Sequence, residues 1–216
     1  MNLEEARTQM LGQQLRTWEV LDDRILEVLG RTPRERFVPP AYHDLAFADM
    51  EIPLDHDQQM MAPKVEGRLL QSLALRPGDT VLEVGTGSGF LTACLAALAG
   101  TVVSIDIFSD FTSGAGEKLD RLEVGNVELR TQDAFDINAS ERFDAIAVTG
   151  SVPAHEEHFI RMLRPGGRLF LIVGRIPIMD ALLITQHENG EWTRDSLFET
   201  VVAPLLNAAQ PEPFVL

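Results

Sequence analysis

The sequence predicts an α/β fold with a doubly wound, mostly parallel, seven-stranded sheet and N-terminal helices. From residue 76 onward, short apolar runs alternate with longer helical segments, the order expected when helices join parallel strands. The strand expected at 80–84 leads through three closely spaced glycines into an Ala/Leu-rich helix at 90–99. Only seven residues then separate the apolar runs 169–173 and 181–185. Because a parallel crossover needs a dozen or more residues, the last strands should be antiparallel.

Length and composition indicate a single domain over 1–216, with N-terminal helices and an irregular loop in 1–75 and the sheet in 76–216. Hydrophobic residues make up 45% and charged residues 24%, as in ordinary globular proteins. No apolar run approaches the roughly 20 residues of a membrane span. The acidic start does not resemble a signal peptide, and the only cysteine is Cys94. We therefore expect a cytoplasmic protein.

The net charge is −15, which opposes non-specific attraction to nucleic acid or to anionic membranes. We accordingly expect neither a nucleic acid nor a membrane as a partner. No metal site is expected, and the sequence leaves the oligomeric state open.

Two helices are expected in residues 1–30. Asp22 should cap the second helix, which should end at Gly30. The apolar residues at helical spacing, expected in the core, are Met10, Leu11, Leu15, Trp18, Ile25, Val28 and Leu29. Prolines force an extended connection over 31–40. The stretch 48–64 has no regular period and precedes a helix at 65–75.

Further strands are expected at 102–105, 127–130, 143–148 and 169–173, with an exit loop at 149–153 and a turn at 164–167. A helix should end at Leu163. Gly114 and Gly116 interrupt the helix 111–122 and should loosen its first half. Asn189-Gly190 predicts a hairpin turn between the strands 181–185 and 192–200.

The glycines Gly85, Gly87 and Gly89 are the first indication of a ligand site. Alternate glycines between a strand and a helix suit positive φ angles and a ligand lying on the backbone, and free amides at the helix start face that ligand. A dinucleotide fingerprint would place its third glycine at position 90, which is Phe90. The match to a nicotinamide site is therefore poor, and an ordinary tight turn is the alternative.

The run from Glu83 to Gly89 resembles the nucleotide loop of Rossmann-like S-adenosylmethionine-dependent methyltransferases, which has an acidic residue, an apolar residue and then G-x-G-x-G. An acidic residue there suits a ligand with sulfonium and ammonium groups. Asp106 follows Gly85 by 21 residues and could accept both ribose hydroxyls, or instead cap the next helix. The resemblance implies S-adenosyl-L-methionine as cofactor and these contacts: Glu83, Gly85, Thr86, Gly87, Gly89, Asp106, Ile107, Asp133, Ala134 and Thr149.

A closer resemblance covers nearly the whole chain. Its residues are the Pro-Arg-x-x-Phe-Val-Pro segment at 33–39, the stretch around His56-Asp-Gln58 and Pro63, and the run from Arg76 through the glycines. These resemble the protein-L-isoaspartate O-methyltransferases. That family implies methyl transfer to the α-carboxylate of isoaspartyl residues in damaged proteins, as a repair step. A carboxylate is already nucleophilic at pH 7, so alignment does most of the work and no strong base is required.

The loop implied to be catalytic comprises His56, Gln58, Gln59 and Met61, and it departs from the family pattern. Where the family has Gly-His-Gly-Gln-Thr-Ile-Ser-x-Pro, this chain has aspartates for both glycines, Gln59 for the threonine and Met61 for the serine. A thioether cannot donate a hydrogen bond. Isoaspartyl methylation is therefore expected to be absent or at least about a hundredfold slower than is usual in the family.

Two explanations of this departure stay open. Met60 and Met61 could be packing residues after a shift of the loop, which would leave the chemistry to backbone amides and Gln58 or Gln59. Alternatively, the acceptor has changed and the aspartates face a neutral or cationic substrate. His56 could be structural or catalytic. The wider alternatives are a methyltransferase with another acceptor and a cofactor-binding protein without catalysis.

Overall fold

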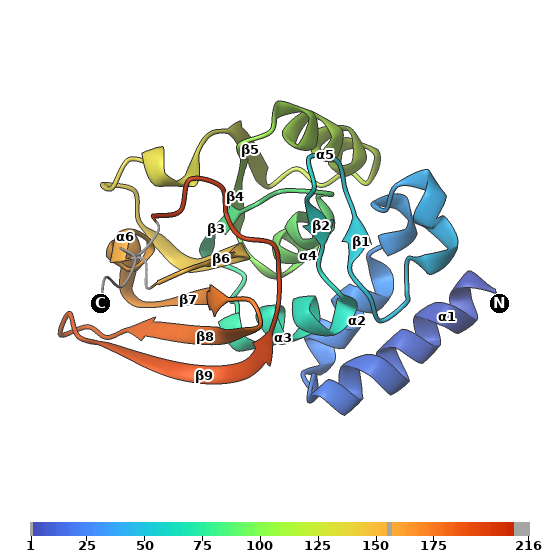
Figure 1. Ribbon diagram of the computed structural model, residues 1–216, viewed down its shortest axis with the longest axis horizontal. Coiled ribbons are helices and arrows are strands. Elements are labelled where there is room, and N and C mark those ends of the chain that lie inside the picture. Colours follow the sequence, from blue (N-terminus) through green and yellow to red (C-terminus); the bar gives the residue numbers. More distant parts are fainter. Residues whose placement is uncertain (1, 155–156, 210–216) are drawn as a thin grey trace, which may run out of the picture.

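The computed structural model describes residues 2–154 and 157–209. Its centre is a seven-stranded sheet in the order β5-β4-β3-β6-β7-β8-β9, beside a two-stranded sheet formed by β1 and β2 (Figure 1). The strands are β1 (Ile52–Pro53), β2 (Gln59–Met60), β3 (Thr80–Val84), β4 (Thr101–Asp106), β5 (Val127–Thr131), β6 (Phe143–Val152), β7 (Leu163–Arg175), β8 (Ile178–Gln186) and β9 (Trp192–Thr200). The strands from β5 to β7 are parallel, whereas β8 and β9 are antiparallel to their neighbours. The predicted sheet is confirmed.

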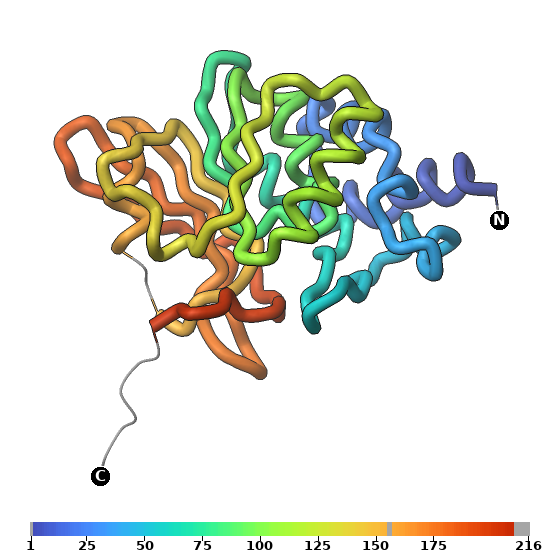
Figure 2. The backbone as a smooth tube through the Cα atoms, turned by 90° about the horizontal axis from the view of Figure 1, so that it is seen from above, coloured from blue at the N-terminus to red at the C-terminus, as the bar shows by residue number. Residues whose placement is uncertain are grey.

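The α-helices are α1 (Leu3–Gln9), α2 (Asp23–Arg31), α3 (Pro63–Leu73), α4 (Phe90–Leu98), α5 (Ser109–Arg121) and α6 (Glu157–Arg161). A π-helix, η1 (Met10–Leu15), continues α1, and the 3-10 turns are η2 (Arg16–Trp18), η3 (Arg34–Arg36), η4 (Pro40–Leu45) and η5 (Ala134–Asp136). In Figures 1 and 2, α1 lies at the opposite end of the molecule from the turn that joins β8 and β9. No helix in the described part of the chain is long and apolar enough to cross a membrane.

Two apolar cores cover the two faces of the sheet. Because side chains alternate along a strand, Val81 of β3 joins the core under α2, α3 and α4, and Leu82 and Val84 join the core under α6. The N-terminal helices thus complete one face, and α6 with the segment that follows β9 completes the other. Both faces are covered, as expected of a doubly wound sheet.

The strand register brings several predicted site residues to one edge. Val84 pairs with Ile105 in β4 and with Val148 in β6, so Gly85, Asp106 and Thr149 follow side by side. Thr131 of β5 pairs with Asp106, which places 132–134 next along the same edge. The chain order also reverses between β3 and β6, the point at which open α/β sheets bind ligands.

Two predicted loops are strand instead. The expected exit loop 149–153 lies mostly in β6, because Ser151 exchanges backbone hydrogen bonds with Ala203 (2.9 Å) and Leu205 (2.8 Å) after a register shift against β7. The expected turn 164–167 lies inside β7, where Leu163 already pairs with Phe143. Both corrections arise from pairing between segments far apart in the sequence.

The helices differ from the predictions at several places. The expected helix 65–75 is α3 (Pro63–Leu73), and the connection 31–40, expected to be extended, contains the 3-10 turn η3 (Arg34–Arg36). Asp22 does cap α2, accepting from the Arg24 N–H at 2.9 Å, but the helix continues to Arg31. The helix 111–122 is not loose in its first half, because α5 is continuous from Ser109 and buries an apolar stripe that starts at Phe111. Leu163 is in a strand, and the preceding helix, α6, ends at Arg161.

Candidate active site

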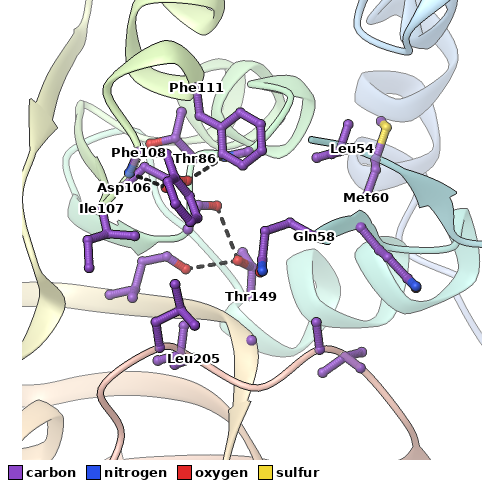
Figure 3. Close-up of a pocket in the computed structure, with 18 of the residues that line it drawn as sticks. Leu54, Gln58, Met60, Thr86, Asp106, Ile107, Phe108, Phe111, Thr149 and Leu205 are labelled. Carbon is purple, nitrogen blue, oxygen red and sulfur yellow. Dashed lines mark hydrogen bonds between the residues drawn. The ribbon is translucent and has the colours of Figure 1, made fainter. Parts of the chain in front are cut away.

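A cavity lies at the carboxyl ends of β3 to β6, and we call it the glycine-loop cavity. The residues after those strands form one wall, the hairpin β1–β2 forms a second, and the segment 202–206 forms a third. Figure 3 shows Asp106, Ile107 and Phe108 on one side, Leu54 and Met60 on the other, and Leu205 below. The predicted site residues that line it are Gln58, Gln59, Met61, Gly85, Thr86, Gly87, Asp106, Ile107, Asp133, Ala134 and Thr149.

The three glycines of the loop all have positive φ, but packing within the protein accounts for two of them. A Cβ at Gly85 would lie 2.1 Å from Thr149 Oγ1, and one at Gly89 would lie 2.8 Å from Ala115 Cβ. A Cβ at Gly87 would meet only Leu54 Cδ1, at 3.4 Å. The expected positive φ angles are therefore confirmed, and packing within the protein by itself requires glycine at Gly85 and Gly89. Ligand contact at these two positions stays a prediction, and Gly89 does not line the cavity.

Asp106 is held in the cavity wall by two backbone donors. Its Oδ2 accepts from the Gly87 N–H at 2.9 Å and its Oδ1 accepts from the Phe108 N–H at 3.0 Å. Burial raises the pKa of this carboxyl, while the backbone donors oppose the rise. Phe108 is itself the N-cap residue of α5. Asp106 thus orders the loop just before the helix and also faces the cavity.

The other strand-end residues are fixed by local hydrogen bonds. Thr149 Oγ1 lies 2.9 Å from the Val84 carbonyl oxygen and 3.1 Å from that of Gly85. Asp133 caps η5 by accepting from the Phe135 N–H at 2.9 Å, and it also accepts from Asn207 Nδ2 at 2.6 Å. These contacts fix the wall without a ligand.

Glu83 lies behind the glycine loop and does not line the cavity. It is fully buried, and its Oε2 accepts from the hydroxyls of Thr92 at 2.5 Å and Ser104 at 2.6 Å. Burial raises the pKa of Glu83 to about 8, since these two hydrogen bonds only partly offset desolvation. Its position does not support direct contact with a cationic ligand.

His56 also lies outside the cavity lining. Its ring stacks on Phe108 with the centroids 3.9 Å apart, and its Nε2 lies 2.8 Å from Asp110 Oδ2. His56 and Asp57 both have positive φ, a strained conformation at the tip of the hairpin. These contacts tie the hairpin to the start of α5, and this supports the structural interpretation of His56.

The altered loop places its methionines in the wall. Met60 and Met61 are buried in the apolar core and line the cavity. Gln58 and Gln59 line it as well, and the Gln58 side chain donates to the His56 carbonyl at 3.0 Å. The aspartates Asp55 and Asp57 are exposed and do not line it, which favours the packing explanation of the loop over aspartates that face a substrate.

Comparison with known proteins identifies the family. The model of the protein-L-isoaspartate(D-aspartate) O-methyltransferase (PCMT) family matches residues 6–210. The chain belongs to the PCMT family. A protein-L-isoaspartate O-methyltransferase of Koribacter versatilis is 33% identical over 201 residues, which are 93% of this chain and 90% of that protein. One of Ectopseudomonas mendocina is 38% identical over 186 residues, 85% of this chain and 88% of that protein.

Solved structures agree on the fold. A Plasmodium falciparum protein named as a protein-L-isoaspartate O-methyltransferase, in complex with S-adenosyl-L-homocysteine, superposes with a TM-score of 0.81 at 21% identity and covers 95% of this chain and 98% of its own. A second structure with that enzyme name gives a TM-score of 0.77 and covers 92% of this chain and 65% of its own. The predicted methyltransferase fold is confirmed.

One buried support of this PCMT-family site, Arg34, was not predicted from the sequence. Its Nε donates to the Ala46 carbonyl at 2.8 Å, one Nη donates to the Met61 carbonyl at 2.7 Å, and the other pairs with Glu66. The guanidinium also lies over the Phe90 ring. The Pro-Arg motif marks this residue in the sequence, but only the fold reveals that it holds both ends of the loop 46–61.

Other cavity residues were also missed. Phe108 and Phe111 come from the start of α5, and the segment 202–206 returns after β9. Glu51 and Glu66 join Asp106 and Asp133, so that four carboxylates line the cavity, whereas its described lining contains no lysine, arginine or histidine. Burial raises the pKa of Glu66 to about 7 against the opposing charge of Arg34. The cavity is therefore suited to a cationic ligand.

Proposed function

We propose that this protein transfers a methyl group from S-adenosylmethionine to the free α-carboxylate of isoaspartyl residues in proteins or peptides. The observation that carries this proposal is that the glycine loop and the hairpin β1–β2 line the same cavity in a chain of the PCMT family. One wall offers strand-end groups for a nucleoside, and the opposite wall is the loop that distinguishes the family.

The residues present fit the methyl donor. Bound S-adenosylmethionine would supply the methyl group and leave as S-adenosylhomocysteine when a carboxylate oxygen displaces its sulfur. The carboxylates that line the cavity suit its cationic sulfonium and ammonium groups. Asp106, Gly87 and Asp133 are the residues that we assign to the nucleoside side. The open space beside the Cα of Gly87 leaves room for close approach of a ligand.

The acceptor side needs alignment rather than acid–base chemistry. Gln58 and Gln59 carry amide donors that can orient an acceptor oxygen, and Arg34 fixes the loop by holding the Met61 carbonyl. A buried and hydrogen-bonded support of this kind keeps attacking oxygen and methyl carbon in line, which is the main source of rate in such a transfer.

A second function is favoured by the charge of the cavity. The lining carboxylates repel an anionic acceptor, and Met61 lacks the donor that a serine hydroxyl would supply. A methyltransferase for a neutral or cationic acceptor is therefore the second candidate.

The test is transfer of labelled methyl from S-adenosylmethionine. An isoaspartyl peptide and the matched aspartyl peptide are offered first, followed by a cell extract. Label on the isoaspartyl peptide alone supports the proposal. Label only on components of the extract supports the second candidate, and binding of S-adenosylhomocysteine without any label indicates a non-catalytic cofactor-binding protein.

We further propose that the protein acts in the cytoplasm on other proteins and binds neither nucleic acid nor membrane. The net charge of −15 supports the part of this proposal that concerns nucleic acid and membranes, because it opposes attraction to phosphates. Cell fractionation followed by immunoblotting tests the location.

A further inference from the structure

A second cavity adjoins the glycine-loop cavity, and we call it the side cavity. The two share five lining residues, Glu51, Gln59, Val202, Ala203 and Pro204. Beyond this shared wall, the side cavity is bounded mainly by apolar residues near the turn between β7 and β8, among them Ile176 and Met179, and by Arg175. It therefore opens from the acceptor end of the site, at Gln59, and leads away from the glycine loop.

The shared wall contains one ionisable side chain, Glu51. Glu51 precedes β1 and is half-buried. Among the described residues, none forms a hydrogen bond or an ion pair with its carboxylate. Burial raises the pKa of this carboxyl, and desolvation is the only cause. A half-buried acid at the junction of two cavities, with no counter-charge in the described part of the chain, is placed to meet a charge on a ligand.

Exposed apolar side chains beside the side cavity also support a ligand at this place. Ile176 is 77% exposed, and Val201 is 43% exposed. Both side chains line the side cavity, so its wall offers apolar surface that a ligand can cover. Residues in an extended chain advance about 3.3 Å each, so a peptide whose isoaspartyl residue reached Gln59 would place its neighbour in the side cavity.

We propose that the side cavity receives the residue adjacent to the isoaspartyl residue, and that Glu51 makes the enzyme select substrates with a basic side chain at that position. This inference rests on the proposed function and adds a substrate class to it. Arg175 also lines the side cavity, but it is exposed, has a partner already and does not reach the shared wall. The first charge that a neighbouring side chain meets is therefore the carboxylate of Glu51.

The experiment uses isoaspartyl peptides that differ only in the residue before or after the isoaspartyl position, which is Lys, Ala or Glu. For one of these two positions, kcat/KM should be about tenfold higher with Lys than with Glu, since a partly desolvated charge pair discriminates to this degree. Glu51→Gln should bring the Lys-to-Glu ratio close to one. Glu188→Gln, an exposed change in the hairpin β8–β9, removes the same charge and should keep the ratio.

Methylation of the Ala peptide tests the proposed function. The ratio of kcat/KM with Lys to kcat/KM with Glu tests the selectivity that we assign to Glu51. If no peptide is methylated, the Kd of each peptide in the presence of S-adenosylhomocysteine decides instead, with the same ratio expected. Equal values for Lys and Glu in the unmodified protein, or a ratio that survives Glu51→Gln, would overturn the inference. A preference for Glu would also overturn it and would assign the side cavity to Arg175.

Discussion

At the scale of single residues, a substitution of Gly87 can distinguish the effect of ligand contact from the effect of backbone strain. Its φ of +50° is in the left-handed region, yet an added Cβ would have only Leu54 Cδ1 nearby, at 3.4 Å. Gly87→Ala should therefore cost only the roughly 1–2 kcal/mol of an alanine in this conformation. We expect it to weaken S-adenosylhomocysteine binding at least about tenfold by calorimetry, because the methyl group would occupy space next to the ligand.

The matched control is Gly190→Ala. Gly190 also has positive φ, and an added Cβ there would have no atom within 4 Å. It lies in the turn before β9, outside the cavity lining. The two variants should lose similar stability, and only Gly87→Ala should lose affinity. Equal affinities in both would remove the glycine loop from the ligand site.

Met61 tests whether the altered loop limits the reaction. Loss of one donor to a developing charge typically costs about 2.7–4 kcal/mol, or roughly 10²–10³ in rate, so the double change Gln59→Thr with Met61→Ser should raise isoaspartyl methylation. Because Met61 is buried, a smaller side chain there lowers stability, and rates should be compared below the melting temperature.

Met61→Ala is the control, since it creates similar space without a hydroxyl. It should not reproduce the gain of the double change. Robust methylation by the unmodified protein, with no gain from the double change, would show that the hydroxyls are not needed in this chain.

At the scale of elements, sequence patterns correctly predicted the helix ends and strands that interactions between neighbouring residues determine. The cap at Asp22 and the strand β9 are set by neighbouring residues and were predicted correctly. The extension of β6 was not, because it depends on Ser151 meeting Ala203 and Leu205, which follow β9. The two glycines of α5 predicted a loose helix, because each lowers helix propensity by about 1 kcal/mol. Burial of the apolar stripe of α5 outweighs this cost.

The loop between η4 and α3 depends on one buried ion pair. Arg34 and Glu66 are 0% and 2% exposed, and Arg34 also binds the carbonyls of Ala46 and Met61. Arg34→Met leaves a buried carboxylate and two carbonyls without their donor. We expect a loss of about 3–5 kcal/mol in the free energy of unfolding, measured with urea, and faster hydrogen exchange over 46–62.

The double change Arg34→Met with Glu66→Leu distinguishes charge from packing. Because it removes the unpaired carboxylate, it should be less destabilised than Arg34→Met alone. If the double variant is instead less stable by the sum of the two single losses, the pair is not coupled and the loop is held by packing alone.

At the scale of the whole molecule, the sequence predicted most of the strand-end wall, part of the hairpin wall through Gln58, Gln59 and Met61, and nothing of the segment 202–206. The glycine loop and the strand ends could be predicted because the register of a parallel sheet aligns them. Glu51, Arg34 and the segment 202–206 could not, because irregular segments have no period from which their positions could be inferred. That Glu83 and His56 lie outside the cavity lining could not be predicted either, since spacing alone does not tell which side of a loop a side chain occupies.

The buried Glu83 makes the stability of the whole molecule depend on pH. Burial holds its pKa at about 8 in the folded protein, against an ordinary value of 4.5. Between these values the folded state keeps a proton that the unfolded state has lost, so stability must fall as pH rises from about 4.5 to about 8. The slope from one such group approaches about 1.4 kcal/mol per pH unit. Urea unfolding from pH 5.5 to 8.5 should show this fall. Glu83→Gln should reduce the slope to the part that Glu66 contributes, since burial raises the pKa of Glu66 as well, to about 7, and the slope above pH 7 should be flat. The exposed change Glu199→Gln should leave the slope as it is, whereas equal slopes in all three proteins would mean that Glu83 titrates alike in both states.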